Sequence, residues 1–168
     1  HKIAGHKDAP GRLYMQNHGG WAGWDGPGGP QPDIGVLRSD DHGRSWRSIA
    51  RGLPSDFGFP IVVHPHDADT VYVMPLEAMT RTCPGGSPAV WRSEDGGGSW
   101  SRLARGFPKK ESFFTVQRDA MDVDDLSSPA LYFGTTTGQL WIGRDGGEDW
   151  SCIFDSLPPI HCVKVGVA

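Results

Sequence analysis

A short pattern that occurs three times constrains the fold of this chain more than any other feature. It reads Ser-x-Asp-x-Gly-x-x-Trp at residues 39–46 and 93–100, and it recurs at 143–150 with Gly143 in place of the serine. Its Asp can accept hydrogen bonds from backbone N–H groups in a tight turn, and its Gly supplies the positive φ that such a turn needs. We therefore expect three similar turns with these structural residues: Asp41, Gly43, Trp46, Asp95, Gly97, Trp100, Asp145, Gly147 and Trp150.

The spacing of the pattern indicates a repeat architecture. Trp100 follows Trp46 by 54 residues, and Trp150 follows Trp100 by 50. A period near fifty residues, filled with short apolar runs, is typical of propeller blades that stack side by side. Because Gly143 removes one serine hydroxyl, the third turn is expected to keep its fold and to lose one local hydrogen bond.

Each repeat contains four short apolar runs separated by turn residues, which predicts four-stranded antiparallel blades in an all-β propeller. The predicted blades are residues 1–56, 57–112 and 113–158. The predicted strands, in order from inner to outer within each blade, are 1–6, 12–16, 34–38 and 46–50, then 61–63, 71–74, 89–92 and 100–103, then 120–123, 130–133, 139–142 and 150–154.

The tail, residues 159–168, has the character of one more inner strand without partners. Propellers usually carry four to eight blades, so about three blades and an orphan strand do not close a ring. Two hypotheses supply the missing blades. Either an upstream segment of a longer chain provides them, or two copies of this chain assemble into one ring.

The repeated pattern resembles the Asp-box, also called the bacterial neuraminidase repeat, over nearly the whole chain. The resemblance implies the fold of the Asp-box β-propellers, which include sialidases, xyloglucan-cleaving glycosidases, sortilin-type receptors and photosystem assembly factors. Bacterial proteins with this repeat are often named glycosyl hydrolases. Because one scaffold serves such different roles, the resemblance implies the fold more strongly than the function.

Composition narrows the classes of partner. The formal net charge is −4 without a run of like charges, so we expect no nucleic acid or membrane partner. Gly 24 and Pro 14 fit a chain of short strands and many turns. The odd cysteine count, without Cys-x-x-Cys spacing, predicts reduced thiols at Cys83, Cys152 and Cys162, which favours the cytoplasm. No metal site and no cofactor is expected.

Strand reversals assign the loops to two faces. The three Trp-ended turns lie on one face, and His64 and His66 fall in a turn on that same side. The opposite face, the predicted mouth, receives the crossover loops 51–59, 105–114 and 155–159 and the second-to-third-strand loops 17–33, 75–88 and 134–138. Long loops such as 17–33 are usually functional or disordered, and we expect the chemistry at the mouth.

The loop 17–33 supplies most of the candidate ligand-binding residues. Trp21 and Trp24 could form a stacking platform for a sugar ring, or they could fold down as a hydrophobic plug. Asn17 and His18 end the second strand at the mouth, where a His can transfer a proton or bind a sugar hydroxyl. Arg118 can grip a substrate carboxylate or hydroxyl, or form a salt bridge between inner strands.

Glycoside hydrolysis generally needs two carboxyl groups, one protonated and one ionised. The candidates for these catalytic roles are Asp119, Glu77 and Asp56, and further mouth carboxylates are Asp25, Asp33 and Glu111. A sialidase would in addition need a nucleophilic Tyr and an arginine triad. The three tyrosines share one strand register, which marks them as packing residues, and only Arg118 and Arg81 could join an arginine cluster.

Two functions therefore stay open. The first is a glycoside hydrolase that uses a carboxylate pair rather than true sialidase chemistry. The second is a non-catalytic propeller that binds a carbohydrate or protein ligand at its mouth or serves as an assembly scaffold. The geometry of the three candidate carboxylates separates them, since carboxylates that are salt-bridged or point outward argue against the enzyme.

Overall fold

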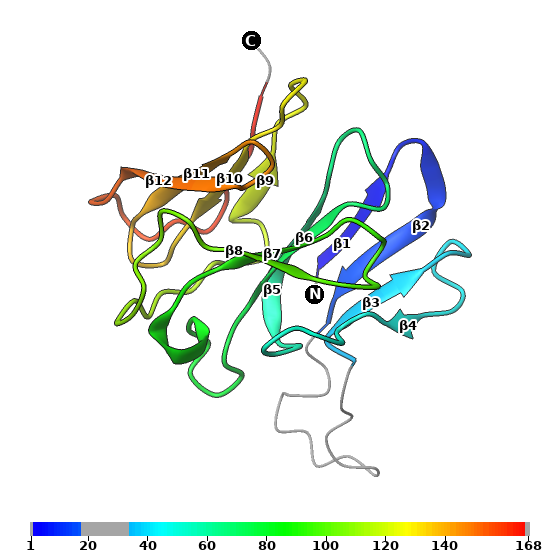
Figure 1. The fold of residues 1–168 in the computed structure, drawn as a ribbon, viewed down its shortest axis with the longest axis horizontal. Helices are drawn as coiled ribbons and strands as arrows, with labels where there is room; N and C mark the ends of the chain where they lie inside the picture. The colour runs from blue at the N-terminus through cyan, green and yellow to red at the C-terminus, as the bar shows by residue number, and fades with distance from the viewer. Residues whose placement is uncertain (1, 18–33, 167–168) are drawn as a thin grey trace.

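The computed structural model describes residues 2–17 and 34–166, and this part of the chain is all-β (Figure 1). Three antiparallel sheets contain four strands each, and within the described ranges no sheet closes on itself. The only helical segment among these residues is the short 3-10 turn η1 (Pro84–Gly86). The architecture is consistent with a β-propeller-like fold.

Each sheet uses strands that follow one another along the chain. The first sheet contains β1 (Lys2–His6), β2 (Ala9–Gln16), β3 (Val36–Ser39) and β4 (Arg47–Ser48). The second contains β5 (Gly58–Val63), β6 (Val71–Pro75), β7 (Val90–Ser93) and β8 (Ser101–Leu103). The third contains β9 (Met121–Val123), β10 (Leu131–Gly134), β11 (Leu140–Arg144) and β12 (Asp149–Phe154). Every strand predicted before the tail has a counterpart.

The tail differs from its prediction. Residues 160–165 form no strand and make one isolated parallel bridge, between Cys162 and Asp119. The Val163 amide donates to the Asp119 carbonyl at 2.8 Å, and the Val165 amide donates to the Asp122 carboxylate at 3.0 Å. The tail thus runs beside the start of β9, where a further inner strand would lie. One bridge without a continuous ladder is too little to make it a strand.

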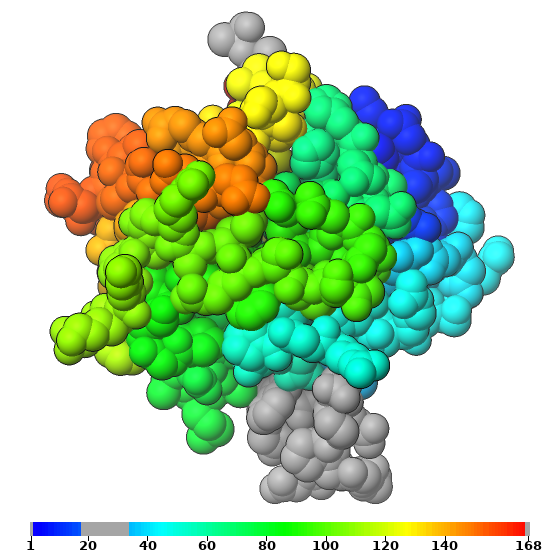
Figure 2. All heavy atoms as spheres, viewed as in Figure 1, coloured from blue at the N-terminus to red at the C-terminus, as the bar shows by residue number. Residues whose placement is uncertain are grey.

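The core lies between the sheets, and residues of the middle sheet belong to both of its clusters. In Figure 2 the middle sheet (green) lies between the first sheet (blue to cyan) and the third (orange). Successive side chains of a strand point to opposite faces. Ile61 and Val63 of β5 accordingly pack toward the first sheet, whereas Val62 packs toward the third. In β6, Val73 and Tyr72 divide between the same two clusters. This sandwiching explains why every residue of β5 and β6 is buried.

The loops lie on two faces, as strand reversal requires. In Figure 1 the β5–β6 and β9–β10 turns reach the top of the view, and the β6–β7 loop leaves at the bottom. A backbone hydrogen bond joins each of the three Trp-ended turns to a turn on the same side: His42 donates to the Gly11 carbonyl at 3.0 Å, Gly96 to the Asp69 carbonyl at 2.8 Å and Gly146 to the Pro129 carbonyl at 2.9 Å. His64 and His66 occupy the β5–β6 turn on this side.

We call the Trp-ended turns the first corner (39–46), the second corner (93–100) and the third corner (143–150). In the second, Asp95 Oδ1 accepts from Ser93 Oγ and from the Ser99 amide, both at 2.8 Å, and the Gly97 amide donates to Ser93 Oγ at 2.7 Å. Hydrogen bonds from Ser99 and Ser93 lower the pKa of Asp95 to about 2. The first corner repeats this network with Ser39, Asp41, Gly43 and Ser45.

The third corner keeps the turn but not the network, which corrects the prediction that it loses a single hydrogen bond. Asp145 itself adopts a left-handed conformation, with φ of 52°, and its carboxylate instead accepts from Ser128 Oγ at 3.2 Å. Two substitutions explain the change. Gly143 removes the first serine, and Asp149 stands where the other corners have the serine that donates to the Asp. Strand pairing extends further here, to Arg144 opposite Asp149.

The three cysteines are free thiols, as predicted, with Cys83 buried and Cys152 and Cys162 exposed. Burial raises the pKa of the Cys83 thiol to about 12, so it stays protonated and behaves as a small core residue. Among the described residues, no helix is long and apolar enough to span a membrane.

Candidate functional site

The inner strands β1, β5 and β9 lie side by side and begin at one end of the molecule, the predicted mouth. Three candidate carboxylates belong to this region: Asp56 precedes β5, Asp119 precedes β9, and Glu77 follows β6. Each makes different contacts. Those contacts decide which of them can exchange a proton with a ligand.

Asp119 is paired with a cation. Its Oδ1 lies 2.9 Å from Lys2 Nζ at the start of β1, so the first and third sheets are joined across the start of the middle one. The hydrogen bond from Lys2 lowers the pKa of Asp119. Its carboxylate is 62% exposed, so the pair contributes little to stability. The carboxylate is held in its ionised form, which suits charge stabilisation and opposes service as a general acid.

Asp56 joins the first two sheets. Its Oδ2 accepts from the Gly35 amide at 3.1 Å, and its backbone carbonyl accepts from Gln16 Nε2 at 2.9 Å. Gln16 is 1% exposed, and its amide also donates to the Gly35 carbonyl at 2.9 Å. These bonds tie the end of β2 to the loop that leads into β5. The sequence analysis did not identify Gln16 as important, because no sequence pattern distinguishes a buried glutamine from an exposed one in a strand.

Glu77 is the exposed member of the three. The Leu76 amide donates to the Phe57 carbonyl at 2.8 Å, which continues the antiparallel pairing of β5 and β6. By this register, Glu77 lies opposite Asp56 on the neighbouring strand end. Its own backbone closes a turn with Arg81 and Thr82. No ion pair or side-chain hydrogen bond joins the Glu77 carboxylate to the described part of the chain.

The candidate binding residues fall into two groups. Arg118 lies with its guanidinium 5.7 Å from the ring centroid of Phe59, a cation–π contact between the loop before β9 and strand β5. Asn17 donates its backbone amide to the Gly35 carbonyl at 2.6 Å and is therefore fixed at the end of β2. Outside the described residues lie the remaining candidates, namely His18, Trp21, Trp24, Asp25 and Asp33.

Glu111, a further mouth carboxylate, is exposed and lies 3.9 Å from Lys110 Nζ. Arg81 has a left-handed backbone, with φ of 58°, and is exposed in the β6–β7 loop. Within the described ranges, no cluster of three or more His, Cys, Asp or Glu residues could hold a metal ion.

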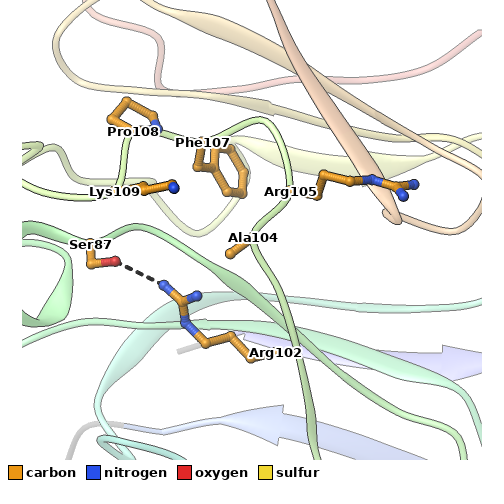
Figure 3. Close-up of a pocket in the computed structure, with 7 residues that line it drawn as sticks. All are labelled: Ser87, Arg102, Ala104, Arg105, Phe107, Pro108 and Lys109. Atoms are coloured by element: carbon orange, nitrogen blue, oxygen red, sulfur yellow. Dashed lines mark hydrogen bonds between the residues drawn. The ribbon is translucent and has the colours of Figure 1, made fainter.

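The mouth loops line a feature that sequence reasoning missed, a groove along the outer part of the middle sheet. We call it the rim groove. Its first pocket, of about 260 Å³, has mostly apolar walls formed by Pro54, Pro75, Pro84, Ser87, Ala89, Trp91 and Arg102. Its second pocket, of about 480 Å³, is lined by Ser87, Arg102, Ala104, Arg105, Phe107, Pro108 and Lys109 (Figure 3). Ser87 and Arg102 line both pockets, so the two adjoin.

Strand register explains how distant residues meet in the rim groove. Trp91 of β7 lies opposite Arg102 of β8, and residues paired across antiparallel strands project to the same side. Ser87 directly follows η1 in the β6–β7 loop, and its Oγ accepts from Arg102 Nη2 at 2.8 Å. Proline clusters at the loop ends were visible in the sequence, but no local signal shows that three separate loops converge on one side of β7 and β8.

Phe107 forms the buried wall of the second pocket. Its ring stacks on Trp150 at 5.0 Å between centroids with an interplanar angle of 23°, and it contacts Trp141 edge-on at 5.0 Å. It is 7% exposed and belongs to the core between the second and third sheets. One wall of the second pocket is therefore a residue of the packed core.

Comparison with solved structures places this fold beside a known enzyme. A crystal structure of a GH74 enzyme from Niastella koreensis, a β-propeller glycoside hydrolase, matches 88% of this chain with a TM-score of 0.60 and 18% sequence identity. The matched part is 20% of that enzyme, so this chain spans about a fifth of its length. No protein-family model and no curated protein matches the sequence. The likeness supports the β-propeller-like fold.

Proposed function

We propose that this chain is a carbohydrate-binding part of a β-propeller and that its rim groove holds a glycan. The single observation that carries the proposal is the apolar pocket formed by Trp91 and three prolines on the mouth side. Half-buried aromatic and proline faces are flat and rigid, so they lose little conformational entropy on binding, and they complement the C–H faces of a sugar ring. The structural likeness to a glycoside hydrolase supports a glycan rather than another small ligand.

The contacts of the carboxylates favour binding over hydrolysis. Hydrolysis needs a protonated acid and an ionised partner on either side of the bond. Asp119 is held ionised by Lys2, and Asp56 accepts from the Gly35 amide. Of the three, Glu77 alone has a carboxylate open to a ligand in the described structure. Two of these three described carboxylates are thus engaged by the protein itself, which favours binding over hydrolysis.

Alanine substitution of Trp91 tests the proposal. A glycan array identifies ligands of the wild-type chain, and titration calorimetry then measures their affinity. We expect Trp91→Ala to weaken binding about fivefold to thirtyfold, since a stacked aromatic face contributes on the order of 1–2 kcal/mol. Met79→Ala is the matched control, because Met79 is 93% exposed in the β6–β7 loop and does not line the groove.

A folded Trp91→Ala variant that binds its glycan as tightly as the wild type would refute binding at this groove. Release of sugar from a glycoside by the wild-type chain, abolished in Glu77→Gln, would refute a purely binding role and favour a glycoside hydrolase. Asp119→Asn is measured in the same assay. We expect it to release as little sugar as the wild-type chain.

We also propose that the three corners are Asp-box repeats and that further blades complete the propeller, either from an upstream segment or from a second copy of this chain. The tail beside β9 supports this, because it follows the inner strand of the third sheet in parallel. Native mass spectrometry of the intact particle distinguishes the two sources. A closed particle that contains this polypeptide twice would exclude the upstream segment.

A further inference from the structure

The second pocket of the rim groove carries positive charge that no acidic side chain of its wall neutralises. Its lining includes Arg102, Arg105 and Lys109 and contains no Asp or Glu. Arg102 bonds to the hydroxyl of Ser87, a neutral partner. The chain as a whole has a net charge of −4, so a pocket lined by three cations departs from its average surface.

Two of these cations face the pocket. In Figure 3 the Arg102 guanidinium and the Lys109 amino group lie across from each other, with Ser87 hydrogen-bonded to Arg102 and Phe107 above and to the right. The Arg105 side chain extends away, toward Asp149, which its Nε approaches at 3.9 Å. Arg102 and Lys109 therefore form the part of the wall that a bound anion would meet.

We propose that this pocket binds the carboxylate of an acidic sugar, a uronic acid residue within the glycan. The assignment rests on the proposed function, because it names the class of glycan that the rim groove takes. Arg102 uses one N–H on Ser87, and its planar guanidinium keeps others for a carboxylate, while Lys109 supplies a point charge from the opposite side. The adjoining pocket, with Trp91 and the prolines, receives the apolar face of a neighbouring ring.

The pocket suits a carboxylate on a sugar better than a free one. Two cations with no acidic partner repel each other, so an anion between them relieves a cost that a neutral sugar leaves in place. A free carboxylate would gain that charge interaction without the apolar contacts of the adjoining pocket. Charge and stacking together therefore select an acidic ring within a chain.

The test compares two oligomers that differ only at the carboxyl group, which is a neutral hydroxymethyl group in the second. Titration calorimetry at low salt measures an oligomer of galacturonic acid and its carboxyl-reduced neutral form against the wild-type chain. We expect the acidic oligomer to bind at least about tenfold more tightly, with an affinity that falls as salt is raised. Arg102→Gln combined with Lys109→Gln should remove this preference. Lys110→Gln is the matched control, since Lys110 is exposed, already lies 3.9 Å from Glu111 and does not line the pocket.

Each outcome bears on a separate claim. Equal binding of the acidic and neutral oligomers would overturn the acidic-sugar assignment and leave the glycan-binding proposal standing. Loss of the preference in Lys110→Gln, or its survival in the double variant, would overturn the role of this pocket. If neither oligomer binds, and no glycan of the array binds either, both proposals fail together. Displacement of the acidic oligomer by acetate at equal concentration would assign the pocket to free carboxylates.

Discussion

The second and third corners form similar turns that are stabilised by different interactions. In the second corner, Ser93, Asp95 and Ser99 form a closed set of hydrogen bonds, and Trp100 stays half-buried. In the third corner that set is absent, and Trp150 is 2% exposed and stacks on Phe107 at 5.0 Å. A polar network holds one turn and aromatic packing holds the other.

Gly143 is the residue that allows aromatic packing to replace the polar network in the third corner. A Cβ atom at this position would lie 2.6 Å from the Trp150 ring, closer than side chains tolerate. The motif serine and the buried indole therefore exclude each other at this corner. The comparison shows that a repeat can retain its turn and its strands while its stabilising interactions change from local to tertiary.

The largest expected effect is the loss of the buried indole. Trp150→Ala should lower the free energy of unfolding by about 3–5 kcal/mol, because it leaves a cavity against Phe107 and Leu131. Trp46→Ala, at the half-buried position of the first corner, should cost less than half as much. Urea unfolding followed by circular dichroism measures both. Equal losses would show that burial does not distinguish the corners.

Restoring the motif serine in the third corner should harm the protein. Gly143→Ser forces the Trp150 ring to shift and should cost about 1–3 kcal/mol, as overpacking does. Gly166→Ser is the control, since a Cβ there meets nothing within 4 Å. A stabilised Gly143→Ser protein would mean that the corner can rebuild the polar network after all.

A smaller loss is expected when the serine is removed from the second corner. Ser93→Ala deletes the acceptor of the buried Gly97 amide and should cost about 1–2 kcal/mol. Ser101→Ala, on the exposed outer strand β8, serves as the control and should change the unfolding free energy little. No loss in Ser93→Ala would show that water replaces the hydroxyl without cost.

The smallest effect concerns pH. Hydrogen bonds hold the pKa of Asp41 and of Asp95 at about 2 in the folded chain, whereas an unfolded Asp titrates at about 4. Because the folded pKa is the lower one, their stabilisation is complete above pH 4 and is lost as the pH falls through about 2. The stability of Asp41→Ala combined with Asp95→Ala should therefore depend less on pH in this window, as measured by urea unfolding at several pH values.

The third corner supplies a control at neutral pH. Asp145→Ala removes a carboxylate that lacks the serine network, so it should lower the free energy of unfolding less than Asp41→Ala does. Equal losses in the two variants would contradict the division between the corners.

Much of the fold follows from local patterns in the sequence. Alternating apolar residues, with turn residues between them, define strands wherever one face is buried, and each strand predicted before the tail is present. The fifty-residue period and the Ser, Asp and Gly of the first two corners act over a few neighbouring residues. Such signals are legible in the sequence because the interacting groups are close along the chain.

What the tertiary structure decided involves residues far apart. Lys2 donates to Asp119, which lies 117 positions further along the chain, and Gln16 donates to the backbone carbonyl of Asp56. In the third corner, Trp150 stacks on Phe107, and no serine network is present. The rim groove forms because strand register sets Arg102 opposite Trp91 while two loops bring Ser87 and Lys109 beside it. Sequence alone determined the strands and two of the corners. The charge partners and the groove depend on how the sheets pack, because each needs side chains from segments that only the folded chain brings into contact.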